Sequence, residues 1–129
     1  MRSLIFAASL LVTTPSFATE WIFCGNADDT ASVGVLVGGI DFAEISATIM
    51  HVGDQDWASS ETYGPGGPIR PAQAFIDDDQ ILIDLTDDES SEIVAQLRVY
   101  LAHEGDDYVQ GGVLRVRGHG AWVVSCDGP

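Results

Sequence analysis

The stretch IVAQLRVYLA, residues 93–102, decides the fold class of this chain. Its odd-numbered positions are all apolar, whereas its even-numbered positions include Gln96 and Arg98. Side chains two residues apart in a β-strand point to the same face, so this alternation is typical of a strand with one buried side. The following HEGDDY, residues 103–108, has turn residues and leads into a second apolar stretch. A β-hairpin is therefore predicted here.

A helix is the alternative for the same segment. Thr86 and Glu89 have the spacing of a helix capping box, and Ile93, Leu97 and Leu101 also fit one helical stripe. Five successive alternations favour the strand over three helical matches. A short helical turn within residues 87–92 is compatible with either reading.

The same period of two recurs along the chain. Alternating or short apolar segments occupy residues 31–37, 42–52, 80–85, 112–118 and 121–126, separated by turn sequences such as GNADD, VGDQD and GHG. The sequence therefore predicts an all-β domain, either a small antiparallel barrel or a flattened sandwich of about eight strands. A small barrel of this kind is filled by its own side chains, so no large internal cavity is expected.

Residues 54–72 interrupt this pattern. Pro65, Pro68 and Pro71 alternate with several glycines there, which predicts a long loop inside the domain, and such loops are often functional. Trp57 and Tyr63 lie in the loop, where burial is harder, and Arg70 lies near its end. We therefore expect Trp57, Tyr63 and Arg70 to contact a partner, because Trp, Tyr and Arg are the usual anchors of protein interfaces.

The first eighteen residues have the pattern of a signal peptide. Arg2 precedes an apolar run from Leu4 to Val12, and Ser16-Phe17-Ala18 forms a small-x-small cleavage site. The apolar run is shorter than the roughly 20 residues of a transmembrane helix, and no later segment reaches that length. The predicted organisation is a signal peptide at 1–18 and a single domain at 19–129, periplasmic or secreted, with no membrane insertion.

The two cysteines agree with export. Cys24 lies shortly after the predicted cleavage site and Cys126 lies near the end of the chain. In an oxidising compartment such a pair predicts one structural disulfide, here between the terminal strands, which would close the sheet. Trp21 and Trp122 flank the two cysteines and are expected to pack around the bridge in the core.

Acidic residues dominate the charge. The chain has 20 Asp and Glu against 5 Lys and Arg, a formal net charge of −15 at pH 7, and none of the five basic residues is Lys. Nucleic-acid binding is excluded as a function, because it requires Lys and Arg to neutralise phosphates. A basic protein is the partner that such a surface favours. Adaptation to salty surroundings is the alternative explanation of the charge.

The densest acidic stretch is FIDDDQILIDLTDDESSE, residues 75–92. If residues 80–85 form a strand, the carboxylates divide into two clusters about 20 Å apart. Each cluster is a candidate Ca²⁺ site, because calcium prefers carboxylate oxygens, whereas the alternative is two solvated loops. The candidate metal ligands are Asp77, Asp78, Asp79, Asp87, Asp88 and Glu89.

Signatures of catalysis are missing from the sequence. The histidines His51, His103 and His119 have no metal-binding spacing and are interpreted as scattered surface residues. No serine has the context of a hydrolase nucleophile, and no carboxylate pair stands out. We therefore expect a protein that is not an enzyme and has no cofactor, with Ca²⁺ as the one candidate ligand.

The chain resembles the small periplasmic C-type lysozyme inhibitors at its two ends, in WIFC at residues 21–24 and WVVSC at residues 122–126. The resemblance implies an eight-stranded antiparallel barrel that inserts a loop into the lysozyme cleft. The inhibitors' Ser-Gly and Lys elements are not matched, because SSETYGPGG at residues 59–67 has a different order and the chain has no Lys.

These observations predict a non-enzymatic exported binding protein, and its most concrete form is an inhibitor-like partner of a cationic hydrolase. A calcium-stabilised structural module of the cell envelope is the second hypothesis. A small hydrolase with unidentified carboxylates is the third.

Overall fold

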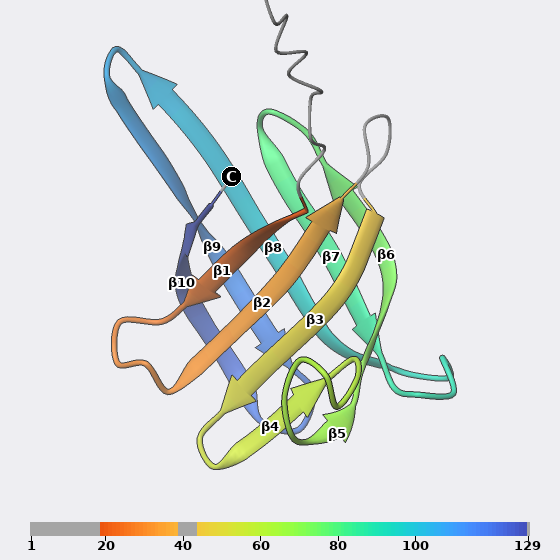
Figure 1. Cartoon of the computed structure of the whole chain (residues 1–129). Helices are drawn as coiled ribbons and strands as arrows, with labels where there is room; N and C mark the ends of the chain where they lie inside the picture. The colour runs from red at the N-terminus through yellow and green to blue at the C-terminus, as the bar shows by residue number, and fades with distance from the viewer. Residues whose placement is uncertain (1–18, 39–43, 129) are drawn as a thin grey trace, which may run out of the picture.

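The computed structural model describes residues 19–38 and 44–128, so the predicted signal peptide at 1–18 lies outside the described residues. The described residues form ten β-strands and no helix (Figure 1). The strands are β1 Glu20–Gly25, β2 Ala31–Gly38, β3 Glu44–Val52, β4 Gln55–Ala58, β5 Gly67–Pro68, β6 Arg70–Ile76, β7 Gln80–Thr86, β8 Ile93–Glu104, β9 Asp107–Val116 and β10 Gly120–Asp127. In this part of the chain there is accordingly no helix of the length and apolarity that crossing a membrane requires.

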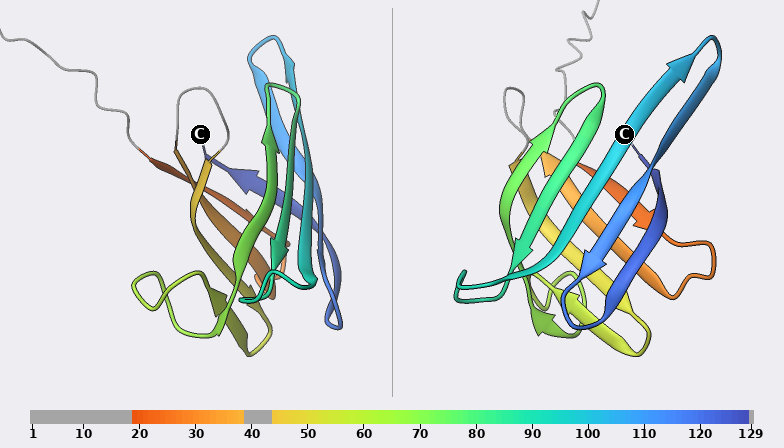
Figure 2. Two further views of the ribbon diagram at one scale, coloured as in Figure 1. Left: turned by 90° about the vertical axis from the view of Figure 1, so that its right-hand side faces the viewer. Right: turned by 180° about the vertical axis from the view of Figure 1, so that it is seen from behind.

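All ten strands belong to one sheet, in the order β5-β4-β3-β2-β1-β10-β9-β8-β7-β6. Neighbours are antiparallel except β4 and β5, which are parallel. The sheet curls until β3 contacts β6, which gives a nearly closed, flattened barrel. β1–β3 form one wall and β6–β9 form the facing wall, as the side view in Figure 2 shows. The predicted all-β class is confirmed.

Two details of the structure differ from the prediction. The structure has ten strands rather than about eight, and residues 54–72 are not one continuous loop, because they contain β4, β5 and the start of β6. Proline did not prevent pairing, since Pro71 lies at a register shift of β6, and β6 is an edge strand of the sheet. An edge strand tolerates proline because one side of its backbone has no hydrogen-bond partner to lose.

The segment at residues 93–102 forms a strand, as its alternation predicted. Ala95, Leu97 and Val99 point into the core, and every residue of β8 from Ala95 to Glu104 has an opposite residue on β9. The last four residues of β8 pair only with β9, because pairing with β7 ends at Tyr100. The β8–β9 hairpin therefore projects beyond its neighbours (Figure 1).

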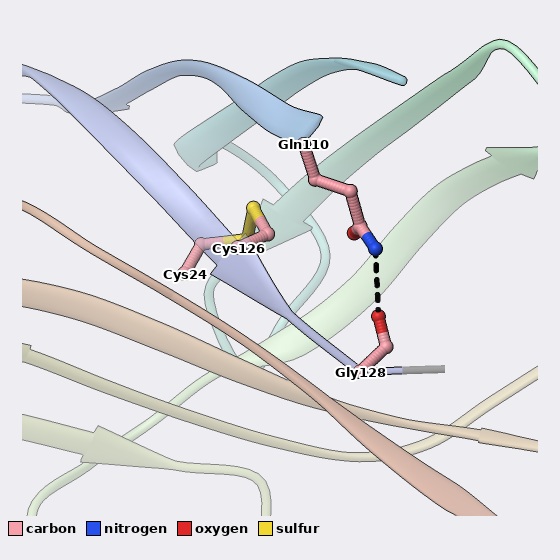
Figure 3. Close-up of a disulfide and its surroundings, with 4 residues drawn as sticks. All are labelled: Cys24, Gln110, Cys126 and Gly128. Atoms are coloured by element: carbon pink, nitrogen blue, oxygen red, sulfur yellow. Dashed lines mark hydrogen bonds between the residues drawn. A yellow bond between two sulfur atoms is a disulfide. The ribbon is translucent and has the colours of Figure 1, made fainter. Parts of the chain in front are cut away.

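The predicted disulfide between the terminal strands is confirmed. Cys24 on β1 lies directly opposite Cys126 on β10, with their Cα atoms 4.0 Å apart and the bridge formed. The bridge lies on the inner face beside Gln110, whose Nε2 donates to the carbonyl of Gly128 at 3.2 Å (Figure 3). The first strand, β1, and the last strand, β10, are thus joined by backbone pairing and by a disulfide. They are the two central strands of the sheet.

The core lies between the two walls. It consists of aliphatic side chains at alternate positions of the central strands, which is the buried half of each alternating pattern. The largest fully buried members are Val33, Val35, Ile69, Ile81, Ile83, Leu85, Leu97, Val99, Leu114, Val116 and Val124.

Candidate functional site

A groove lies on the outer side of the wall formed by β1–β4, where the segment at residues 59–66 folds back over the strands. We call it the outer groove; its volume is about 260 Å³. This is just below the roughly 300–1,000 Å³ of typical small-molecule pockets, so the groove suits a single side chain. Its lining residues are Phe23, Ser32, Gly34, Ile49, Met50, His51, Asp56, Trp57, Tyr63, Gly64 and Pro65.

Aromatic rings form one side of the outer groove. Trp21 and Phe23 stack with ring centroids 5.4 Å apart, and Trp21 meets Tyr63 edge to face at 6.0 Å. Phe23 and Tyr63 remain 49% and 42% exposed. Phe23 lies over Gly34, where an added Cβ would come within 2.7 Å of the ring. The missing side chain at Gly34 therefore lets the ring lie flat on the sheet.

A row of polar side chains crosses the neighbouring strands. Ser32 on β2 lies opposite His51 on β3, which lies opposite Asp56 on β4. His51 Nδ1 is 2.5 Å from Asp56 Oδ1. An ionised carboxylate can only accept, so Nδ1 carries the proton and donates it to this bond. The bond orients the Asp56 carboxylate on the outer face, in the groove that Phe23 and Tyr63 also line.

Hydrogen bonds fix the segment that carries Tyr63. The backbone N–H of Ser59 donates to the carbonyl of Thr48 at 2.9 Å, and the Thr48 N–H donates to Ser59 Oγ at 3.0 Å. Gly66 has a φ of 118°, and an added Cβ would lie 2.0 Å from the carbonyl oxygen of Asp56. Only glycine fits there. The return of the chain over β4 therefore places Tyr63 at the groove.

The wall that bears the outer groove has no compensating positive charge. The described residues from 19 to 68 contain no Lys or Arg, but they include the carboxylates of Glu20, Asp28, Asp29, Glu44, Asp54, Asp56 and Glu61. The four arginines from residue 19 onward lie at positions 70, 98, 115 and 117, on or beside the facing wall. Three of them pair with local carboxylates: Arg70 with Asp88 at 3.0 Å, Arg98 with Asp84 at 2.7 Å and Arg117 with Glu92 at 3.7 Å.

The structure separates the three predicted partner-binding residues. Tyr63 is exposed and forms part of the outer groove. Trp57 was expected in an exposed loop, but it lies on β4, points inward and is only 8% exposed, so that expectation was wrong. Its ring packs edge to face against His119 at 5.2 Å, and the residue is also among those that line the groove. Arg70, the first residue of β6, pairs with Asp88 in the turn after β7 and is not among the groove residues.

The acidic stretch forms two turns at opposite ends of β7. Asp77, Asp78 and Asp79 precede the strand, whereas Asp87, Asp88 and Glu89 follow it. Asp77 Oδ1 accepts from the backbone N–H groups of Asp79 and Gln80, both at 2.8 Å. In residues 19–38 and 44–128, no group of three or more His, Cys, Asp or Glu side chains is placed to hold a metal ion. Calcium binding by these turns stays a prediction.

Asp87 is held by the turn in which it lies. The Ser91 hydroxyl donates to Asp87 Oδ2 at 2.7 Å, and the Ser91 N–H donates to Oδ1 at 2.9 Å. The hydroxyl first, and then the backbone N–H of Ser91, lower the pKa of Asp87 below its usual 3.8, because both stabilise the ionised carboxylate. These bonds explain the loop conformation without any bound ion.

Sequence reasoning missed most of the outer groove. Trp21 was expected in the core beside the disulfide, but it lies on the outer face and stacks on Phe23. The alternation of side chains in WIFC could have predicted this position. Trp21 and Phe23 lie an odd number of residues from Cys24, so in a strand they point to the face opposite the buried Cys24. His51 was interpreted as an isolated surface residue, whereas a two-residue turn at Gly53-Asp54 sets it opposite Asp56.

Comparisons of this chain with protein-family models, with curated proteins and with solved structures find no match.

Proposed function

We propose that this protein is a non-enzymatic exported binding protein whose outer groove takes a basic side chain of a protein partner. Its most concrete form is an inhibitor-like partner of a cationic hydrolase. The observation that carries the proposal is the juxtaposition of Phe23, Tyr63 and the Asp56 carboxylate in one groove, on a wall without Lys or Arg in its described residues.

The groove has both elements that recognise a basic side chain. Aromatic faces attract an ammonium or guanidinium group, by about 0.5–1 kcal/mol at exposed sites and more when desolvated. The Asp56 carboxylate supplies the opposite charge, and its second oxygen is not used by His51. An arginine fits best, because its planar guanidinium both stacks on rings and binds carboxylates through two N–H groups.

The remaining carboxylates act at longer range. A net charge of −15 attracts a basic protein before contact and raises its association rate, an effect that salt screens. The two contributions can be measured separately. The acidic wall affects the association rate, and the outer groove affects the dissociation rate of the complex.

The disulfide supports the exported setting. A bridge between Cys24 and Cys126 persists where thiols are not kept reduced, as in the periplasm or outside the cell. A periplasmic or secreted location is part of the proposal.

A C-type lysozyme is the probe that tests the proposal. Its binding to the purified protein is measured by biolayer interferometry, together with lysozyme activity on peptidoglycan. Asp56→Asn removes the groove carboxylate, and Asp107→Asn is the matched control, because Asp107 lies on the β8–β9 hairpin, outside the groove. Binding weakened by the first variant alone supports the proposal. Absence of binding, or equal losses in both variants, contradicts it.

A further inference from the structure

A second, larger pocket lies at the open end of the barrel, on the inner side of the walls. We call it the mouth pocket; its volume is about 710 Å³, within the roughly 300–1,000 Å³ range of small-molecule sites. Its described lining residues are Ile22, Val37, Ile76, Asp77, Asp78, Ile81, Leu101, His103 and Tyr108. No residue of the outer groove is among them.

The inner part of the mouth pocket is aliphatic. Ile22 and Ile81 are buried and continue into the core, while Val37, Ile76 and Leu101 pack against that core and remain partly exposed. They come from five strands that surround the opening: β1, β2, β6, β7 and β8. An alkyl chain that enters the opening would therefore contact aliphatic side chains from several sides.

The outer part of the mouth pocket is polar and acidic. His103 and Tyr108 lie opposite each other on the projecting hairpin, with ring centroids 4.4 Å apart. Asp77 and Asp78 lie on the neighbouring β6–β7 turn. The Leu101 N–H donates to the carbonyl of Asp79 at 2.8 Å, which fixes this turn to the base of the hairpin. No Lys or Arg is among the described lining residues.

We propose that the mouth pocket binds a single-chain cationic amphiphile. The alkyl chain contacts Ile22, Val37, Ile76, Ile81 and Leu101, and the cationic head group lies against Tyr108 and the carboxylates of Asp77 and Asp78. Aromatic faces and carboxylates attract quaternary ammonium groups. An amphiphile with an anionic head group and the same chain length is repelled, because the described polar part offers the carboxylates of Asp77 and Asp78 and no Lys or Arg.

Isothermal titration calorimetry with three amphiphiles of equal chain length tests this assignment. Decyltrimethylammonium carries the cationic head, decyl maltoside a neutral one and decyl sulfate an anionic one, each below its micelle concentration. We expect one decyltrimethylammonium per chain, weaker binding of decyl maltoside and no binding of decyl sulfate. Equal affinities for the cationic and anionic probes, or no binding of the cationic probe, would overturn the proposal.

Variants distinguish the pocket from general attraction of cations to an acidic protein. Leu101→Asn places an amide on the aliphatic part, and Asp78→Asn removes one carboxylate that makes no side-chain hydrogen bond in the described structure. We expect Leu101→Asn to weaken decyltrimethylammonium binding about tenfold, and Asp78→Asn to weaken it while leaving decyl maltoside unchanged.

Two matched controls complete the experiment. Val123→Asn makes the same kind of change at an 80% exposed position on the outer face of β10, and Asp54→Asn removes a carboxylate outside the pocket. Both should retain full binding. Equal losses in the pocket variants and their controls would show surface attraction only and would overturn the proposal. Thermal melts verify folding, and Asp78→Asn keeps the test decisive if Leu101→Asn does not fold.

Discussion

His51 and Asp56 face each other across the β3–β4 turn, with Nδ1 of the imidazole 2.5 Å from Oδ1 of the carboxylate. This contact holds the Asp56 carboxylate in the groove that Phe23 and Tyr63 also line. The His51–Asp56 bond therefore orders this part of the groove in the free protein, and under the proposed function such order would reduce the entropy lost on binding.

The His51–Asp56 contact determines which imidazole nitrogen carries the proton. We predict that His51 is in the Nδ1–H form at neutral pH, which ¹⁵N NMR of the ring distinguishes directly. Asp56→Asn should lower the population of this form, because an amide accepts the bond less strongly than a carboxylate. An Nε2–H tautomer in the unmodified protein would contradict the geometry.

Two glycines should respond differently to alanine. At Gly112 an added Cβ lies 1.8 Å from the backbone oxygen of Arg98, whereas at Gly34 it meets the partly exposed ring of Phe23 at 2.7 Å. The Phe23 ring can rotate away from an added methyl group, whereas the backbone of β8 at Arg98 is held by its pairing with β9 and cannot move. We predict that Gly112→Ala lowers the free energy of unfolding by about 3 kcal/mol or more, and that Gly34→Ala lowers it by about 1 kcal/mol.

Urea unfolding of both glycine variants measures these changes. Gly53→Ala is a useful reference, because an added Cβ there has no neighbour within 4 Å, although its φ of 58° disfavours alanine. Gly34→Ala should also disturb the outer groove by displacing Phe23. Equal stabilities of the Gly112→Ala and Gly34→Ala variants would contradict the packing described here.

The disulfide closes a loop with a sequence separation of 102. On the chain-entropy account, replacing both Cys24 and Cys126 with serine lowers the free energy of unfolding by about 4–5 kcal/mol. The measurement is urea unfolding of the double variant against the oxidised protein. Reduction of the unmodified protein should give a similar loss. An unchanged unfolding midpoint in both cases would show that β1–β10 pairing alone sustains the barrel.

The Asp87 turn predicts a pH dependence of stability. Its pKa is lowered in the folded protein, so its hydrogen bonds with Ser91 contribute above the unfolded pKa, and the contribution is lost as pH falls through the folded pKa. Ser91→Ala should raise the pKa of Asp87 toward 3.8, as measured by carboxyl ¹³C NMR titration. Ser125→Ala, in the middle of β10, is the control. An unchanged Asp87 pKa in Ser91→Ala would contradict the assigned cause.

The fold class could be predicted from the sequence because one face of each main strand is buried. The alternation at residues 93–102 specifies both the strand and its inward residues, and the two cysteines predicted the meeting of the terminal strands. β4, β5 and β6 were missed because they are short or lie at the margin of the sheet. Pairing with a neighbour stabilises them despite proline, glycine and polar residues, and that pairing is not visible in local composition.

The outer groove could be predicted only in part. Tyr63 was found because an aromatic residue lies in a glycine- and proline-rich segment. The same argument failed for Trp57, which lies on β4, pairs with Met50 on β3 and points inward. The rest of the groove depends on register across four strands. The pairing of β2 with β3 and of β3 with β4 places Ser32, His51 and Asp56 in one row. A shift of one residue in the pairing of a strand would turn its polar side chain to the opposite face of the sheet.

The most direct test of the proposed function is the kinetics of C-type lysozyme binding at low salt and at 0.5 M salt. We predict a one-to-one complex whose association rate falls strongly at high salt, where the Debye length is only about 4 Å. Asp56→Asn should raise the dissociation rate about tenfold, equivalent to 1.4 kcal/mol, while Asp107→Asn leaves it unchanged. No complex at either salt concentration, or a dissociation rate insensitive to Asp56→Asn, would contradict the account.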